Sequence, residues 1–377
     1  MKRAISIITA AVIILSLSAC KNNEASKSDW RIVSSNNLVE PEKNGMFITN
    51  TYSSLSFLDF STMEQAPVCD DPTCMHQVDS GCTSYGKENH PFLYGDKLYY
   101  LKRSDIYQDK DIYINDTQLW QSDINGANEK LVTEFKKLDY SSYNNMVLYG
   151  DTIYMCMEYK PFDKDYNELE HAEKFVTYNL KSGKTKNYGD IVKGYVCSSD
   201  IIGVWDNKVI FRISNSKENL PYMELVEKYA KDNGVPQSEA MTAVVNEYDT
   251  IYWQFDISEK SISESMLSSP MAISKNCYYY SEEDKITYLD KDGNENIING
   301  IIDINDAQIH DGYVYFCNHD EDNPSAYLFN EQSKEVTTLD NNYVISAISN
   351  DTVILQIIDD KNGTLSYEKK AISEIEK

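Results

Sequence analysis

Hydrophobic and polar positions alternate with a period of two along most of the chain, and the alternation comes in recurring units. Each unit begins with a turn that contains Gly, Asp or Asn and continues into a strand rich in Tyr, Ile and Val. The units lie at 95–101, 150–156, 206–211, 275–280, 311–316 and 350–355, with a weaker first copy at 44–48. A second strand follows most copies and runs into a polar turn such as Asn125-Gly126, which is a strong hairpin signal.

Seven such copies, at a spacing of roughly 36 to 70 residues, are typical of a repeat architecture. A period of two favours strands over helical repeats, and closure into a ring removes the exposed edges of many short antiparallel strands. The sequence therefore predicts an all-β fold, a seven-bladed β-propeller of four-stranded antiparallel blades, over residues 30–377. A pair of irregular β-sandwiches is the alternative. We expect residues 30–33 to add a strand to the last blade and close the ring.

One stretch, residues 216–247, breaks the alternation. It contains two runs of good helix formers, 223–230 and 238–245. We therefore predict a small helical insertion in the fourth blade. It is either a decoration or a lid or docking surface on one face of the disc.

Three of the eight cysteines lie close together in a loop at 67–90. Cys69, Cys74, His76 and Cys82 have the spacing Cys-x4-Cys-x-His-x5-Cys. Thiolate and imidazole are preferred zinc donors, and four of them complete a tetrahedron, so this pattern indicates a structural zinc site. A disulfide with one thiol left over is the alternative, because a secreted protein meets oxidising conditions.

The other chemistry-bearing residues are sparse. Cys156, Cys197, Cys277 and Cys317 are interpreted as core thiols, since buried Cys behaves as a small hydrophobe. Among the five histidines, we expect His90 and His171 to lie in solvated loops. His310 and His319 flank the sixth repeated strand and are candidates for one mouth of the propeller channel.

The N-terminus predicts the location of the protein. A positive start, Met1-Lys2-Arg3, precedes a short apolar run and then Leu17-Ser18-Ala19-Cys20. This pattern predicts a signal peptide at 1–19, since the run is too short to span a bilayer comfortably. The last four residues look like a bacterial lipobox, which implies a lipid-bearing (palmitate-type) Cys20 and a tether at 20–29. We expect the protein to be anchored at the extracytoplasmic face of the cell membrane.

Composition narrows the class of partner. With 35 Lys and Arg against 60 Asp and Glu, the formal net charge is −25. Such a field repels phosphate backbones, so nucleic-acid binding is excluded. The 41% apolar residues are enough for a large core.

The lipobox, the Tyr-rich repeat and the Cys/His segment together resemble a family of uncharacterised surface lipoproteins of Gram-positive bacteria. The propeller domains of that family have no assigned function and are similar to TolB-like and quinoprotein-like propellers. The match at Cys69, Cys74, His76 and Cys82 is the most specific part of the resemblance, whereas the helical insertion departs from a plain propeller. The resemblance implies a fold and a location but no activity.

Two functions follow as hypotheses. The first is a propeller that binds a protein, glycan or peptide, or scaffolds an envelope complex, without catalysis. The alternative is an extracellular hydrolase or lyase that acts on carbohydrate or peptide through carboxylates at the propeller mouth.

Overall fold

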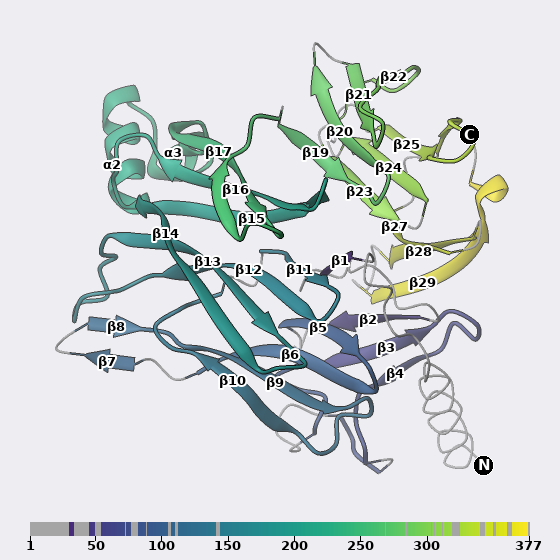
Figure 1. Ribbon diagram of the computed structural model, residues 1–377, viewed down its shortest axis with the longest axis horizontal. Coiled ribbons are helices and arrows are strands. Elements are labelled where there is room, and N and C mark those ends of the chain that lie inside the picture. The colour runs from purple at the N-terminus through teal and green to yellow at the C-terminus, as the bar shows by residue number, and fades with distance from the viewer. Residues whose placement is uncertain are drawn as a thin grey trace.

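The computed structural model is a ring of seven antiparallel sheets, which confirms the predicted β-propeller (Figure 1). The structure describes the residues 30–33, 45–49, 54–71, 73–76, 82–87, 89–104, 107–109, 112–140, 144–267, 269–282, 285–302, 304, 306–310, 312–318, 325–339, 344–349, 352–359 and 364–375. The predicted signal peptide and tether, and with them Cys20, lie outside these residues.

Each sheet is one blade, and the blades follow chain order. Blade 1 holds β2 (Gly45–Thr49), β3 (Leu55–Asp59) and β4 (Gln65–Pro67). Blade 2 holds β5 (Asn89–Tyr94), β6 (Lys97–Arg103), β9 (Thr117–Asp123) and β10 (Lys130–Phe135), with the hairpin β7 (Tyr107–Asp109) and β8 (Ile112–Ile114) inserted between β6 and β9. Blade 3 holds β11 (Met146–Tyr149), β12 (Thr152–Tyr159), β13 (His171–Asn179) and β14 (Lys184–Gly194).

The second half of the ring repeats this plan. Blade 4 holds β15 (Val196–Trp205), β16 (Lys208–Ser216), β17 (Tyr248–Asp256) and β18 (Ser261–Glu264). Blade 5 holds β19 (Pro270–Ile273), β20 (Cys277–Glu282), β21 (Lys285–Asp290) and β22 (Glu295–Ile298). Blade 6 holds β23 (Asp306–His310), β24 (Tyr313–Asn318), β25 (Ser325–Asn330) and β26 (Val336–Thr338). Blade 7 holds β27 (Val344–Ser349), β28 (Thr352–Asp359) and β29 (Thr364–Ala371), followed by the 3-10 turn η3 (Ile372–Glu374). Blades 1 and 7 thus have three described strands each, not four.

The repeated sequence phrase forms the second strand of its blade. From blade 2 to blade 7, these strands are β6, β12, β16, β20, β24 and β28, and the first four each follow a tight turn that contains Gly, Asp or Asn. Their Tyr side chains are largely structural: Tyr100, Tyr278 and Tyr279 are almost completely buried. The aromatic alternation is therefore explained by packing between blades.

Hydrophobic clusters at the blade interfaces close the ring. Between blades 7 and 1, Met46 and Ile48 pack with Ala347 and Ile354. The Lys369 ammonium also donates to the Phe60 carbonyl across this seam, at 3.1 Å. Within the described residues, side-chain packing holds the seam and no strand is shared across it.

The prediction that residues 30–33 join the last blade is wrong. The strand they form, β1 (Trp30–Val33), pairs antiparallel with β11, on the inner edge of blade 3. It also contacts β5 and β15, and it lies near the middle of the molecule in Figure 1. The strand therefore occupies the ring axis, which period-two alternation alone could not predict.

Two details fix β1 in the axis. The Arg31 guanidinium donates to the Leu93 carbonyl of blade 2. Trp30 lies so close to blade 4 that a Cβ at Gly203 would come within 3.0 Å of its ring. Glycine at 203 is the residue that permits this approach.

The predicted helical insertion is confirmed in blade 4. Between β16 and β17 lie α2 (Tyr222–Asn233), α3 (Gln237–Ala243) and the 3-10 turn η2 (Val244–Glu247). Gly234 ends α2 in a left-handed conformation, with φ of 67°. Leu225, Val226 and Ala240 form a small apolar cluster between the helices. Within the described residues, no helix combines the length and apolarity needed to cross a bilayer.

Candidate functional site

The Cys/His loop brings its four predicted ligands together. One ligand atom from each of Cys69, Cys74, His76 and Cys82 lies within 4.8 Å of all the others. His76 Nδ1 and Cys82 Sγ are 3.4 Å apart. Sulfur and nitrogen bonds to zinc of about 2.0–2.3 Å place tetrahedral ligands somewhat under 4 Å from one another, so small side-chain shifts would complete a site. This cluster could hold a metal ion.

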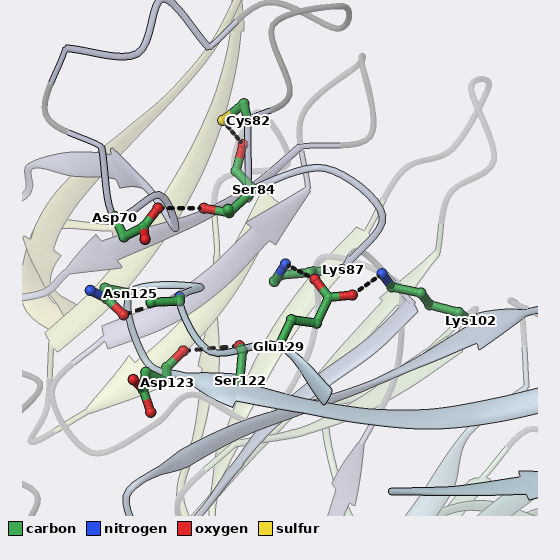
Figure 2. A network of polar contacts seen from close by, with 11 residues as sticks. Asp70, Cys82, Ser84, Lys87, Lys102, Ser122, Asp123, Asn125 and Glu129 are labelled. Atoms are coloured by element: carbon green, nitrogen blue, oxygen red, sulfur yellow. Dashed lines mark hydrogen bonds and ion pairs between the residues drawn. The ribbon is translucent and has the colours of Figure 1, made fainter. Parts of the chain in front are cut away.

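The backbone around the ligands is already shaped for convergence. His76 has a φ of 52°, a left-handed conformation that is uncommon for a residue with a side chain. Its carbonyl accepts a hydrogen bond from the Tyr85 hydroxyl at 2.8 Å. The Ser84 hydroxyl lies 3.0 Å from Cys82 Sγ, as Figure 2 shows. These contacts orient two ligands from behind, as outer-shell partners do in metal sites.

The three cysteines of the cluster are free thiols in this structure. Burial raises the pKa of the Cys69 thiol to about 11. A bound cation would oppose that shift, because metal coordination favours the thiolate.

The Cys/His loop joins blade 1 to blade 2. The carbonyl of Ser84 in this loop accepts a hydrogen bond from the Leu55 N–H of blade 1, at 2.9 Å. On the other side, the Gly126 turn of blade 2 approaches so closely that a Cβ there would lie 2.6 Å from the Val68 carbonyl. A metal in this loop would therefore stabilise a contact between blades.

A charged network continues from the loop into blade 2. The Lys87 side chain is fully buried, and its ammonium lies 2.8 Å from Glu129 Oε2. Figure 2 shows Lys87 and Lys102 converging on Glu129. Both ammonium groups also lie over the Tyr100 ring, at 5.1 and 5.4 Å. Each buried charge here has a partner, as burial of charge requires.

The interpretation of the remaining cysteines agrees with the structure where their side chains are described. Cys156, Cys277 and Cys317 are buried. Burial raises the pKa of each of these thiols. The side chain of Cys197 lies outside the described residues, although its backbone belongs to β15.

The expectation of solvated loops for His90 and His171 is wrong. His90 is completely buried in β5, and burial lowers its pKa to about 4. His171 is the buried first residue of β13. His310 ends β23 and is 3% exposed, with its pKa lowered to about 4 by burial. His319 lies outside the described residues, so the pairing of the two at a channel mouth stays a prediction.

Sequence reasoning missed a buried carboxylate pair in blade 3. Glu158 of β12 and Glu173 of β13 lie directly opposite one another in the sheet. Both are buried, and among the described residues neither oxygen of Glu173 has a hydrogen-bond partner in good geometry. Burial, and then the neighbouring carboxyl group, raises the pKa of Glu173 well above its usual value. Burial likewise raises the pKa of Glu158. Burial therefore disfavours ionisation of this pair.

The strand register shows that blades 2, 3 and 4 carry short turns at one end and long connections at the other. Tight turns at 95–96, 150–151 and 206–207 join the first two strands of each blade. The connections between the second and third strands lie at the opposite ends and are long. We call these connections, at 104–116, 160–170 and 217–247, the rim layer.

Two members of the rim layer contact one another, and the third is linked to the start of its own blade. Tyr113 and Phe162 exchange two backbone hydrogen bonds, each of 2.9 Å. Tyr195 N–H donates to Asn219 Oδ1 at 3.3 Å, which links the start of blade 4 to the helical insertion. Figure 1 shows the helices and the β7–β8 hairpin on the same side of the molecule.

No protein-family model matches the chain, and no curated protein matches it. Several solved structures are similar to it at low identity. The oligogalacturonate lyase of Vibrio parahaemolyticus is 8% identical, with 92% of each chain covered and a TM-score of 0.48. The β-propeller domain of the Trilobed protease from Pyrococcus furiosus, described as having an open velcro topology, is 11% identical over 87% of this chain and 90% of that one, with a TM-score of 0.44. TolB from Acinetobacter baumannii is 10% identical over 79% of this chain and 64% of that one, with a TM-score of 0.37. These likenesses assign no residue role to this chain.

Proposed function

We propose that the protein is an extracytoplasmic lipoprotein, anchored through Cys20, whose propeller binds a ligand or protein partner or scaffolds an envelope complex without catalysis. The position of β1 is the observation that carries this proposal. The direction of this strand along the ring axis determines the end of the disc from which a tether to the membrane would leave.

The register of β1 defines that orientation. Trp30 pairs with Tyr149, next to the tight turn at 150–151, whereas Val33 pairs with Met146 toward the other end. The chain therefore enters the axis at the tight-turn end. A ten-residue tether at 20–29 spans at most about 35 Å. The tight-turn end then faces the membrane, and the rim layer faces away from it and is free to meet a partner.

The carboxylate pair of blade 3 does not supply the acid and base that the hydrolase or lyase alternative needs. Propeller-mouth catalysis needs an acid and a base that touch the substrate. Glu173 is fully buried and Glu158 is 8% exposed, so this pair lies out of reach of a substrate. The ring axis beside blade 3 is occupied by β1.

For the Cys/His loop we propose a structural zinc ion. Cys69, Cys74, His76 and Cys82 would supply all four ligands, which leaves no open position for water or substrate. The ion would contribute stability to the contact between blades 1 and 2.

The anchor can be tested by expressing the full-length protein and a Cys20→Ala variant in a bacterium that processes lipoproteins. The cells are fed an alkyne fatty acid and separated into membrane and soluble fractions. We expect the native protein to be labelled and membrane-bound, and the variant to be unlabelled and released from the membrane. A native protein that carries no fatty acid and fractionates as soluble would contradict the proposal.

A further inference from the structure

The rim layer contains a small aromatic hollow. It measures about 130 Å³ and is lined by Tyr113, Asn115, Phe162 and Tyr166. Tyr113 belongs to β8 and Asn115 follows it, while Phe162 and Tyr166 come from the connection between β12 and β13. Two blades therefore build the hollow jointly, at the end opposite the tight turns.

Its walls are held in place before any ligand arrives. The paired backbones of Tyr113 and Phe162 join the hairpin to the neighbouring connection. The rings of Tyr113 and Tyr166 stack at 5.1 Å, with 21° between their planes. A preformed wall reduces the ordering cost of binding.

Tyr166 is the most unusual member of this group. This large aromatic residue is 64% exposed. Its φ of 61° is a left-handed conformation that suits glycine. The turn is held by Asp163, whose carboxylate accepts from Asn167 N–H at 2.8 Å and from Asn167 Nδ2 at 2.9 Å. The fold thus keeps an aromatic ring at the surface in a backbone conformation that disfavours it.

Polar groups stand behind one side of the hollow. Asn115 Nδ2 donates to Asp139 Oδ2 at 3.2 Å, and Arg103 Nε donates to Asp139 Oδ1 at 2.7 Å. The Arg103 side chain is 54% exposed, so guanidinium donors remain for a ligand. Lys160, whose ammonium lies 5.9 Å from the centre of the Phe162 ring, pairs with Glu168 at 2.7 Å.

These ion pairs decide the class of ligand. Because Arg103 and Asp139 neutralise one another, as do Lys160 and Glu168, a charged ligand finds no unpaired counter-charge among them. A neutral ligand with many hydroxyls can still use the amide, guanidinium and carboxylate groups. Aromatic rings with polar edges offer flat apolar faces for the C–H side of a sugar ring.

We propose that this hollow is a binding site for a neutral saccharide, with one sugar ring packed on Tyr166 and Phe162 and its hydroxyls directed toward Asn115 and Arg103. The inference deepens the proposed binding function, because it places the ligand on the face turned away from the membrane. It names a site and a ligand class.

The test uses full-length protein in detergent and three neutral probes: the tetrasaccharides of glucose, mannose and N-acetylglucosamine. Saturation-transfer NMR detects contact, and titration gives the affinity. The key variant is Tyr166→Gly, which removes the ring and suits the left-handed backbone, so the fold is retained. The matched control is Lys260→Gly, an exposed turn residue with a φ of 54° in blade 4.

We expect at least one neutral probe to bind, and its affinity to fall about three- to tenfold in Tyr166→Gly and to stay unchanged in Lys260→Gly. Binding of none of the three probes would overturn the proposal. So would equal binding to both variants, or tighter binding of tetragalacturonate or tetralysine at the same residues. Because the measurement is made in detergent, its outcome is independent of whether Cys20 is lipidated.

Discussion

Two regions of this propeller gather acidic side chains in its interior, and the charge of these groups is neutralised in different ways. Between blades 1 and 2, the three cysteines gather around His76, and Lys87 and Lys102 converge on Glu129. In blade 3, Glu158 and Glu173 face each other, and no group in the described part of the chain makes a well-aligned hydrogen bond to the two oxygens of Glu173. A cation suits the first region and a proton suits the second.

The difference shows what each region contributes. A network of paired charges stabilises the contact between two blades, whereas two facing buried carboxyl groups cost stability when they ionise. The second region lies next to the rim layer, where we place ligand binding. Lowering the pH should therefore destabilise the first region, because protons displace a metal from thiolates. It should stabilise the second region, because protons neutralise its carboxylates.

Among the changes that test this comparison, metal removal should alter the stability of the protein most. A bound ion at 1,000 times its dissociation constant stabilises the native state by about 4 kcal/mol. We expect a chelator to lower the Tm of the native protein, measured by circular dichroism. The Cys74→Ser variant should begin at the lower Tm and show no further response. An unchanged Tm in chelator, with two of the three cysteines found oxidised, would make the loop a disulfide staple instead.

Loss of the buried Lys87 ammonium should have the second-largest effect on stability. The Lys87→Met variant deprives Glu129 of its buried partner but leaves Lys102, so we expect a loss of about 2 kcal/mol in the free energy of unfolding. Lys97→Met is the matched control, because Lys97 pairs with Asp123 at 2.6 Å with both side chains about one-third exposed. An exposed pair of this kind is worth less than about 1 kcal/mol. Equal losses of unfolding free energy in the two variants would show that the buried Lys87 pair contributes no more to stability than the exposed Lys97 pair.

The Glu173→Gln substitution should stabilise the protein, in contrast to the two changes above. The folded protein raises the pKa of Glu173, so it holds a proton that the unfolded chain releases above its ordinary pKa. Its contribution to stability is therefore complete at low pH and is lost as the pH rises toward the folded pKa. We expect the variant to gain roughly 1–2 kcal/mol at pH 8 and little at pH 4. Denaturant unfolding at the two pH values measures the difference.

Glu168 provides a control with the other sign. Burial alone would raise its pKa, but His171 and Lys160 outweigh burial and lower it to about 2. Its contribution is present above the unfolded pKa and is lost as the pH falls toward about 2. We therefore expect Glu168→Gln to destabilise the protein at pH 8. A stability gain there, or a loss in Glu173→Gln, would contradict the contrast.

Local pattern was sufficient to predict much of this molecule. Turn-and-strand phrases predicted the blades, and the runs of helix formers predicted α2 and α3. The spacing of the Cys/His segment predicted that its four ligands, from Cys69 to Cys82, would converge. Each of these rests on residues close in sequence, where periodicity and turn chemistry decide the structure.

Long-range pairing was not predictable in the same way. The position of β1 depends on Gly203, which lies about half the chain away and admits the Trp30 ring. The Glu158–Glu173 pair depends on the register of two strands, although a signal existed. Glu158 follows Cys156 at a period of two and Glu173 precedes Phe175, so both carboxylates occupy positions where strand alternation calls for apolar residues.

The orientation of the disc on a membrane tests the central claim most directly. A fluorescent amino acid is placed either at Asp96, in an exposed tight turn, or at Lys164, in the exposed rim layer. The lipidated protein is reconstituted into vesicles that carry an acceptor dye at the bilayer surface. We predict stronger energy transfer from position 96 than from position 164. Equal transfer from both positions, or stronger transfer from 164, would contradict a propeller that faces the membrane with its tight turns and presents its rim layer outward.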